Sequence, residues 1–289
     1  MTRTPIRPNR LLRGLATVGA ITLVGALAAC APADSSPEST SPSTELSYVT
    51  DGKLTIATGQ PAYGPYVVDD TPENGEGFES AVAYAVAEEL GFAKDDVVWV
   101  RTGFEEAIQP GQKTFDFNLQ QFSITPEREA TVDFSSPYYS TPQAIVTLEG
   151  SPAAGATSVA DLADVLVGAQ TGTTSFTTAE TVIAPSQGVQ AFNTNDDAKL
   201  ALQSGTIDAL VVDLPTAFYL TSAELDGGVI VGQLPATAGV SDDWGLLLDK
   251  DSSLTPSVTA AVDALREDGT LADLAEQWLG GDAGAPVLE

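Results

Sequence analysis

One arginine, Arg128, stands among hydroxyls and amides in the stretch QQFSITPEREATVDFSSPYY. A guanidinium is a planar fork of donors that binds a carboxylate through two parallel hydrogen bonds. Ser123 and Thr125 precede it at the expected start of a short helix, where hydroxyls cap the chain and free N–H groups favour anions. We therefore interpret Arg128 as a carboxylate-binding residue. The alternative is a surface ion pair with Glu127 or Glu129, which would add little stability.

Asp213 is a candidate partner for a positive group. It ends the apolar run IDALVVD, an expected strand, and open α/β sheets bind ligands at the carboxyl ends of their strands. The alternative is that it caps the following segment, LPTAFYL, and both roles can hold together. Because an amino acid carries a carboxylate and an ammonium, Arg128 and Asp213 suit such a ligand. The turn TGTT, Thr171 to Thr174, adds hydroxyls and N–H groups, although such turns are common.

The order of apolar patterns indicates the scaffold for these residues. Short β-branched runs alternate with amphipathic ones from Lys53 onward, as in KLTIAT, GFESAVAYAVAEELGF and DVVWV. A second series contains DDAKLALQSG and DALVVD, and the tail has two helical patterns broken at Asp268-Gly269. This alternation predicts an α/β fold built from two lobes. Two extended runs, QAIVTLE and WGLLLDK, are suited to link the lobes, and we expect the hinge there.

The N-terminus has the pattern of an export signal. Four arginines precede an acid-free apolar run, Leu15 to Ala29, which is short for a membrane-spanning helix. The run closes on Leu-Ala-Ala-Cys, which resembles the bacterial lipobox, so residues 1–29 are expected to be cleaved and Cys30 lipidated. Cys30 is the only cysteine, which excludes a disulfide within the chain. The Ser/Pro/Thr-rich residues 31–47 are expected to form a flexible tether.

Charge and composition exclude several functions. The chain has 12 Lys/Arg and 40 Asp/Glu, and removing the four signal arginines leaves 8 − 40 = −32. Such a surface disfavours nucleic acid and anionic lipid headgroups. With no histidine and a lipidated cysteine, the commonest general base and metal ligands are missing. No nucleophile elbow or nucleotide loop is present, so we expect no cofactor, no metal and no catalysis.

Four motifs in a fixed order resemble the amino-acid-binding extracellular solute receptors that feed ABC importers. They are SITPER...VDFSSPYY, DLADVLVGAQTGTT, LQSGTIDALVVD and LREDGTLADLAEQWLG, and the resemblance covers roughly residues 48 to 282. It implies a fold like that of the periplasmic binding proteins, with two crossing connections and the ligand between the lobes. The implied boundaries are 48–143 plus 242–289 for lobe 1 and 144–241 for lobe 2.

The resemblance also assigns roles to pocket residues. It implies that Thr173 and Thr174 close onto the ligand carboxylate, and that Gln121 meets the ammonium through its backbone carbonyl. Many members carry a small residue at that position, so the glutamine departs from the family pattern. The helix opening GFESA also departs from the family's usual acidic version, which we expect to affect mainly the lobe surface.

The far end of the pocket is expected to select the ligand side chain. In family register Tyr63 and Phe104 form aromatic walls, with ordinary core packing as the alternative. Gln60 and Gln170 lie where members place groups that contact the side chain, and both are neutral amides. We therefore predict a neutral L-amino acid, polar or of moderate size. Asp69 or Glu73, from a loop with no family match, could still supply an acid.

The predicted function is that of a monomeric, lipid-anchored receptor on the outer face of the cell membrane, which delivers an amino acid to an ABC permease. A ligand-binding sensor lipoprotein without a transport role is an alternative. A lyase or dehydratase on the same fold, with Asp213 or Glu79 as the acid, is a less favoured one.

Overall fold

The computed structural model describes residues 46–235, 242–280 and 284–289. The signal peptide, Cys30 and most of the predicted tether lie outside the described residues, so these assignments stay predictions. Within the described ranges, no helix is both long and apolar enough to cross a membrane.

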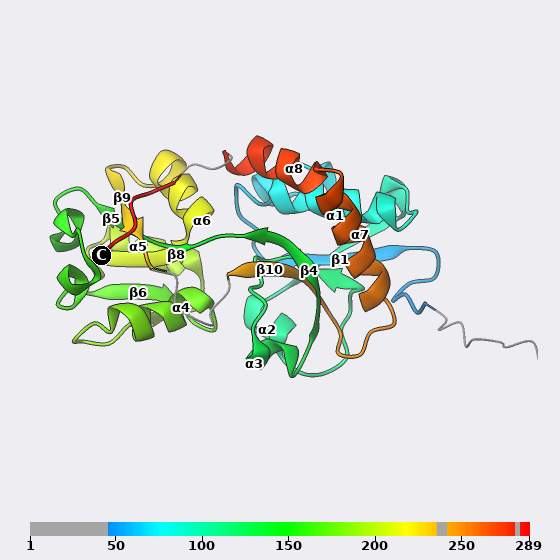
Figure 1. Cartoon of the computed structure of the whole chain (residues 1–289), viewed down its shortest axis with the longest axis horizontal. Helices are drawn as coiled ribbons and strands as arrows, with labels where there is room; N and C mark the ends of the chain where they lie inside the picture. Colours follow the sequence, from blue (N-terminus) through cyan, green and yellow to red (C-terminus); the bar gives the residue numbers. More distant parts are fainter. Residues whose placement is uncertain (1–45, 236–241, 281–283) are drawn as a thin grey trace, which may run out of the picture. The chain divides into compact units, whose positions relative to one another are not determined.

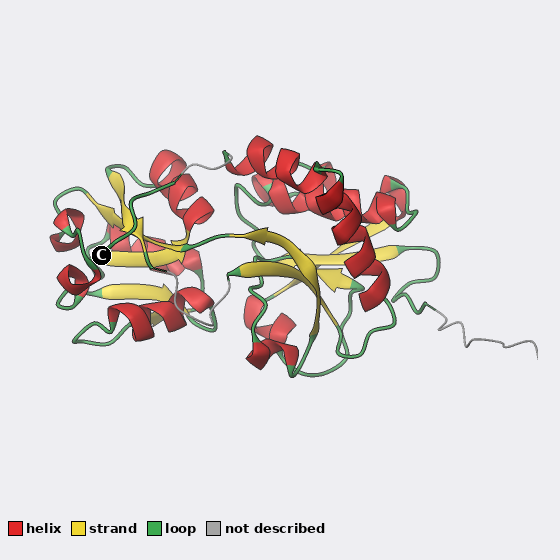
Figure 2. Ribbon diagram, in the orientation of Figure 1, coloured by secondary structure: helices red, strands yellow, loops and turns green. Residues whose placement is uncertain are grey.

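The first lobe is built on a five-stranded sheet in the order β2-β1-β3-β10-β4 (Figures 1 and 2). β1 lies parallel to β2 and β3, and β10 runs antiparallel to β3 and β4. All six residues of β1 are buried, as expected for a central strand covered on both faces. The strands are β1 (Leu54–Gly59), β2 (Val97–Thr102), β3 (Phe117–Asn118), β4 (Asp133–Ser140) and β10 (Asp243–Leu248).

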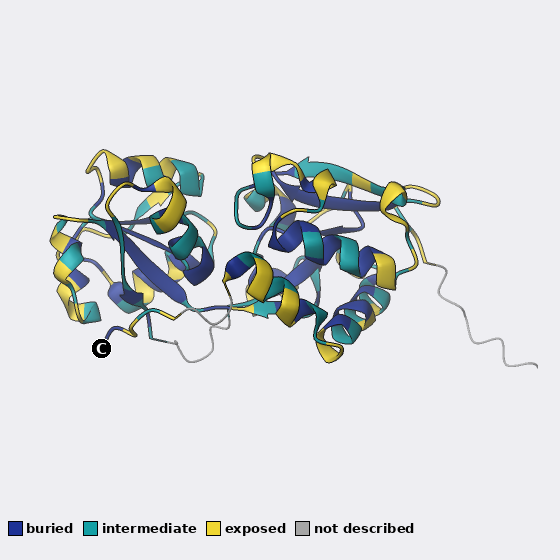
Figure 3. Cartoon of the chain, turned by 90° about the horizontal axis from the view of Figure 1, so that it is seen from above, coloured by how far each residue is buried: buried dark blue, intermediate teal, exposed yellow. Residues whose placement is uncertain are grey.

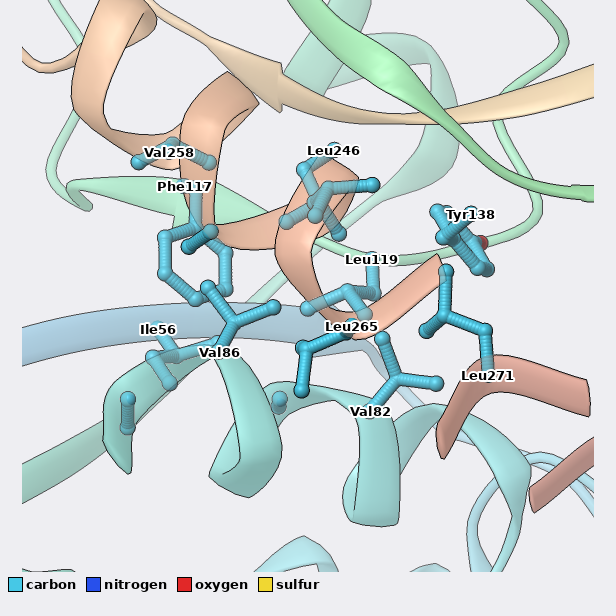
Figure 4. Close-up of a cluster of buried hydrophobic side chains, with 14 of the residues drawn as sticks. Ile56, Val82, Val86, Phe117, Leu119, Tyr138, Leu246, Val258, Leu265 and Leu271 are labelled. Carbon is cyan, nitrogen blue, oxygen red and sulfur yellow. The ribbon is translucent and has the colours of Figure 1, made fainter. Parts of the chain in front are cut away.

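Helices cover the two faces of this sheet, and the alternation along β1 separates two cores. Ile56 packs into a large cluster with α1, α7 and α8, where Val82, Val86 and Leu265 meet the sheet (Figure 4). The next residue, Ala57, belongs to a second cluster on the other face. The helices of this lobe are α1 (Phe78–Glu89), α2 (Phe104–Ile108), α3 (Pro126–Glu129), α7 (Thr255–Glu267) and α8 (Thr270–Leu279).

The second lobe repeats the arrangement with the order β7-β6-β8-β5-β9. β6 is parallel to β7 and β8, and β5 is antiparallel to β8 and β9. Figure 3 shows buried strands between helices whose outer surfaces are exposed. The elements are β5 (Gln143–Leu148), β6 (Val167–Gln170), α4 (Thr174–Thr178), β7 (Gln190–Phe192), α5 (Asn195–Gln203), β8 (Ala209–Asp213), α6 (Leu214–Tyr219) and β9 (Gly228–Gln233).

The two-lobed α/β prediction is confirmed, but the predicted hinge position is wrong. QAIVTLE forms β5 inside the second sheet, and WGLLLDK forms most of β10 inside the first sheet. Strands paired on both sides cannot act as linkers, because bending them would break their hydrogen bonds. The first passage between the sheets lies just before β5, at Thr141 and Pro142, and the second lies between β9 and β10.

The C-terminal tail returns to the second lobe, which differs from its predicted place in lobe 1. Val287 pairs with Gln233 of β9, and Leu288, 3% exposed, packs into one of that lobe's two cores. The backbone carbonyl of Glu289 accepts a hydrogen bond from the Val159 N–H at 3.0 Å. The tail follows α8 of the first lobe in sequence, but the burial of Leu288 and the backbone hydrogen bonds hold it on the second lobe.

Candidate ligand-binding site

The ten predicted ligand residues line two cavities that share part of their wall. The cavities have volumes of about 160 and 40 Å³, and both lobes contribute to each. The shared wall consists of Phe104, Gln120, Gln121, Gln170 and Asn195. Gln60 and Tyr63 line the larger cavity, which we call the outer chamber. Ser123, Arg128, Thr173, Thr174 and Asp213 line the smaller one, the inner chamber.

Arg128 is 8% exposed and is held by groups from both lobes. Its Nη1 donates to the Ser123 carbonyl at 2.7 Å and its Nη2 to the Gly172 carbonyl at 2.9 Å. Its guanidinium lies 5.4 Å from the ring centre of Phe104. Burial lowers the pKa of Arg128 to about 10, so the side chain stays charged at neutral pH. Among the described residues it forms no ion pair, in contrast to the surface-pair alternative.

The two hydroxyls before Arg128 have different functions. Thr125 caps α3, because its Oγ1 accepts the Arg128 N–H at 3.2 Å. Ser123 does not cap; its Oγ lies 3.1 Å from Thr174 Oγ1, a hydrogen bond between the lobes. Ser123 also forms a backbone bridge with Trp244 of β10. The predicted helix start is thus held both by β10 of its own lobe and by Thr174 of the second lobe.

The turn TGTT supplies the second-lobe wall of the inner chamber. Thr173 caps α4, since its Oγ1 accepts the Phe176 N–H at 3.1 Å while donating to the Gln170 carbonyl at 2.7 Å. Gly172 has a φ of 73°, the left-handed conformation that glycine adopts most readily. This turn directs the Gly172 carbonyl to Arg128 and the Thr174 hydroxyl to Ser123.

Asp213 ends β8 and is held by an amide rather than by a helix cap. Its Oδ1 accepts from Gln143 Nε2 at 2.6 Å, and Gln143 Oε1 accepts from Ser175 Oγ at 2.6 Å. No side-chain cap bond to α6 forms, although Asp213 occupies the capping position. Burial, and then repulsion from Asp242, raises the pKa of Asp213 to about 7. A cationic group beside this carboxylate would favour its ionised form.

The aromatic walls combine packing with lining of the cavities. Phe104 stacks on Phe122 with 4.9 Å between ring centres, so the core alternative holds together with the pocket prediction. Tyr63 is half-buried, and burial followed by the neighbouring Asp196 raises its pKa. A second tyrosine, Tyr66, joins the lobes through its hydroxyl, 2.8 Å from Thr216 Oγ1.

The structure adds amides to the outer chamber that were not predicted. Asn193 and Asn195 enter from the end of β7 and the start of α5, and Gln120 from the loop after β3. Gln120 Nε2 donates to Thr102 Oγ1 at 2.8 Å and to Asn118 Oδ1 at 3.1 Å. The sequence signal was available, because QQFS and FNTND place amides within a few residues of the ends of β3 and β7.

Glu79 corrects the expectation that the GFESA opening affects mainly the lobe surface. It is 2% exposed and lines the outer chamber. Gly77, two residues before Glu79, cannot carry a side chain, since a Cβ would lie 2.4 Å from the Tyr66 carbonyl oxygen. This close approach brings the start of α1 against the pocket wall.

Within the described part of the chain, no group of three potential metal ligands gathers.

Two open α/β lobes that share a polar cavity define a protein that binds a small solute between its lobes. The chain belongs to family 3 of the bacterial extracellular solute-binding proteins, whose model it matches over residues 54–281. The family resemblance drawn from the four motifs is thereby confirmed.

Individual proteins of known name are also similar. The L-arginine-binding protein of Pseudomonas aeruginosa is 30% identical over 229 residues, or 76% of this chain and 86% of that protein. An ancestral arginine-binding protein bound to glutamine is 31% identical with a TM-score of 0.67, covering 80% of this chain and 99% of that one. The ancestral amino acid-binding protein AncCDT-1, a precursor of cyclohexadienyl dehydratase, is 30% identical with a TM-score of 0.64, covering 79% and 95%.

Proposed function

We propose that this chain is a receptor that binds a neutral, polar L-amino acid between its lobes and passes it to an ABC importer. The observation that carries the proposal is the inner chamber, where a buried arginine and a carboxylate line one small cavity. Arg128 would bind the ligand carboxylate and Asp213 its ammonium. Similar proteins named for arginine binding support an amino acid as the ligand class.

The outer chamber supports a neutral ligand side chain. Its polar lining is mainly amides and hydroxyls, and its carboxylate, Glu79, already accepts hydrogen bonds from Gln121 and Tyr138. A cationic side chain would need an unsatisfied acid, and an anionic one a further base, because burying an unpaired charge is costly. Amides donate and accept, so they suit an uncharged polar side chain such as that of glutamine.

The cellular setting is part of the proposal. The Leu-Ala-Ala-Cys stretch supports a mature protein that begins at lipidated Cys30 and is held at the outer face of the cell membrane by its tether. Membership of an extracellular family supports this location. The sensor alternative differs only in what the ligand-bound form contacts, and neighbouring permease and ATPase genes would favour import.

The enzyme alternative receives less support. AncCDT-1 is described as a precursor of a dehydratase, but is itself named as an amino acid-binding protein. The raised pKa of Asp213 has a binding explanation, since a ligand ammonium would offset it. Turnover of a prephenate-like substrate by the purified protein would favour the enzyme reading instead.

A thermal-shift panel of the common L-amino acids tests the ligand class. A tight ligand stabilises the folded state by RT ln(1 + [L]/Kd), about 2.7 kcal/mol at a hundredfold excess over Kd. We expect the largest shift with glutamine or another neutral polar amino acid. If arginine, lysine or glutamate gave the largest shift and the neutral set none, the proposed ligand class would be wrong.

A further inference from the structure

Glu79 forms a buried hydrogen-bonded cluster at the wall of the outer chamber. Its Oε1 accepts from the backbone N–H of Gln121 at 2.8 Å, and its Oε2 accepts from Gln121 Nε2. The Tyr138 hydroxyl also donates to Oε1. Three donors from the loop after β3 and from β4 therefore meet one carboxylate at the start of α1. Glu79 and Tyr138 are 2% and 3% exposed.

Gln121 has a backbone conformation that needs such support. Its φ is 51°, the left-handed region that residues other than glycine rarely adopt. Such conformations persist only where the surrounding structure over-determines them. Glu79 binds this residue at both ends, at its backbone N–H and its side-chain amide. Among the described residues none donates a hydrogen bond to the Gln121 carbonyl, and Gln121 lines both chambers.

We propose that Glu79 is a positioning residue of the ligand-binding site, which turns the side chain of Gln121 away and presents its backbone carbonyl to the ligand ammonium. The inference rests on the proposed amino-acid-binding function. It also accounts for a glutamine at a position where many family members carry a small residue. The long side chain of Gln121 is hydrogen-bonded to Glu79, so it leaves the pocket volume open for the ligand.

Protonation of Glu79 would weaken this arrangement. Burial raises its pKa to about 7, although the hydrogen bonds from Tyr138 and Gln121 act in the opposite direction. The ionisable groups that interact with it are Tyr138, Tyr66 and Asp213. A protonated carboxyl offers one acceptor less, so the grip on Gln121 should loosen as the pH falls below about 7. Asp213 titrates in the same range, so affinity against pH alone cannot separate the two.

An exchange of the two side chains separates positioning from general structure. Glu79→Gln keeps the shape but removes the charge, and its NH₂ meets the NH₂ of Gln121 until that amide turns over to present its oxygen. Gln121→Glu alone would place two carboxylates together. The double variant Glu79→Gln/Gln121→Glu restores a donor and an acceptor in reversed order. Glu88→Gln is the matched control, because Glu88 is an exposed acid of the same helix.

The first measurement uses the free protein, without any ligand. We expect the backbone amide resonance of Gln121 in ¹H–¹⁵N spectra to move with pH around a midpoint near 7 in the wild type and in Glu88→Gln. Loss of this titration is expected in Glu79→Gln. The inference would be overturned if the Gln121 chemical shift did not change between pH 5 and 9 in the wild type, or if it titrated in Glu79→Gln as it does in the wild type. Either result holds whether or not an amino acid binds.

The second measurement is calorimetry with L-glutamine, or with the amino acid that gives the largest thermal shift. We expect Kd to rise at least tenfold in Glu79→Gln and to return within threefold of the wild type in the double variant. Wild-type affinity in Glu79→Gln, or a double variant as weak as the single one, would contradict positioning. If the wild type itself binds no amino acid, the proposed function fails, and the resonance titration alone decides the role of Glu79.

Discussion

The two chambers between the lobes differ both in the charge of their linings and in their burial. In the inner chamber Arg128, Ser123 and Thr174 are buried, and hydrogen bonds join the two lobes there. In the outer chamber Gln60 and Asn193 are exposed. The inner chamber suits the α-carboxylate and α-ammonium groups that all amino acids share, and the outer chamber suits the side chain, which differs among them. Affinity should therefore depend on the inner chamber and selectivity on the outer one.

The largest loss of affinity is expected from Arg128→Ala. Removing one partner of a buried, hydrogen-bonded charge pair costs about 2–5 kcal/mol, and each 1.4 kcal/mol is about tenfold. Kd for the best ligand should therefore rise roughly 30-fold or more in calorimetry. Arg266→Ala is the matched control, because that arginine pairs with Asp263 on the surface of α7. Similar affinities of the two variants would remove Arg128 from the site.

Asp213→Asn should produce a smaller loss of affinity together with a gain in stability. Burial raises the pKa of Asp213 to about 7, above its ordinary value. Ionisation is therefore opposed in the folded state, so the free energy of unfolding should fall as pH rises toward 7. One pKa unit corresponds to about 1.4 kcal/mol. At pH 8 the free energy of unfolding of Asp213→Asn should therefore exceed that of the wild type by at least about 1 kcal/mol.

The same substitution should weaken ligand binding about tenfold or more above pH 7, since the ammonium loses its counter-ion. Wild-type affinity should itself fall below about pH 7, as the carboxylate takes up a proton, and this dependence should be smaller in Asp213→Asn. Urea unfolding and calorimetry at pH 6 and 8 measure both effects. A variant that is less stable and binds normally would assign Asp213 a structural role.

The contrast between the chambers also explains what the sequence could predict. Arg128, Asp213 and the TGTT turn belong to short contiguous motifs, in which the local chain sets the geometry. The GFESA opening was expected to affect mainly the lobe surface, because the burial of Glu79 depends on Gly77 passing close to Tyr66, a contact that no pattern within α1 contains. The amides of the outer chamber likewise converge only after both lobes have folded.

The lobes themselves were predictable from alternating patterns, but the passages between them were not. The segments of β5 and β10 were predicted to be linkers, because an extended apolar run has the same sequence pattern in a paired strand as in a connection between lobes. Their hydrogen-bonded neighbours, β8 and β3, are distant in sequence. The return of the tail to the second lobe rests on Leu288 and its backbone pairing, a signal too short to stand out from an ordinary C-terminus.

The smallest effect on affinity is expected at Gln60, where the outer chamber opens to solvent. A typical hydrogen bond contributes about 0.5–1.5 kcal/mol net, so Gln60→Ala should weaken binding of the best ligand by roughly two- to tenfold. Gln109→Ala is the control, since Gln109 is exposed in the same lobe and lines neither chamber. A loss as large as that of Arg128→Ala would contradict the division between the chambers.

Gln60→Asp sharpens the same comparison by changing selectivity rather than affinity. A carboxylate at this position would give a cationic side chain the partner that the amide cannot provide. It should also repel the side-chain carboxylate of an anionic ligand. The ratio of arginine affinity to glutamine affinity should therefore rise by about tenfold or more. The inner chamber should still bind the α-carboxylate and α-ammonium groups of both ligands. An unchanged ratio would mean that Gln60 does not face the ligand side chain, and that the selectivity lies with Gln170, Asn193 or Asn195 instead.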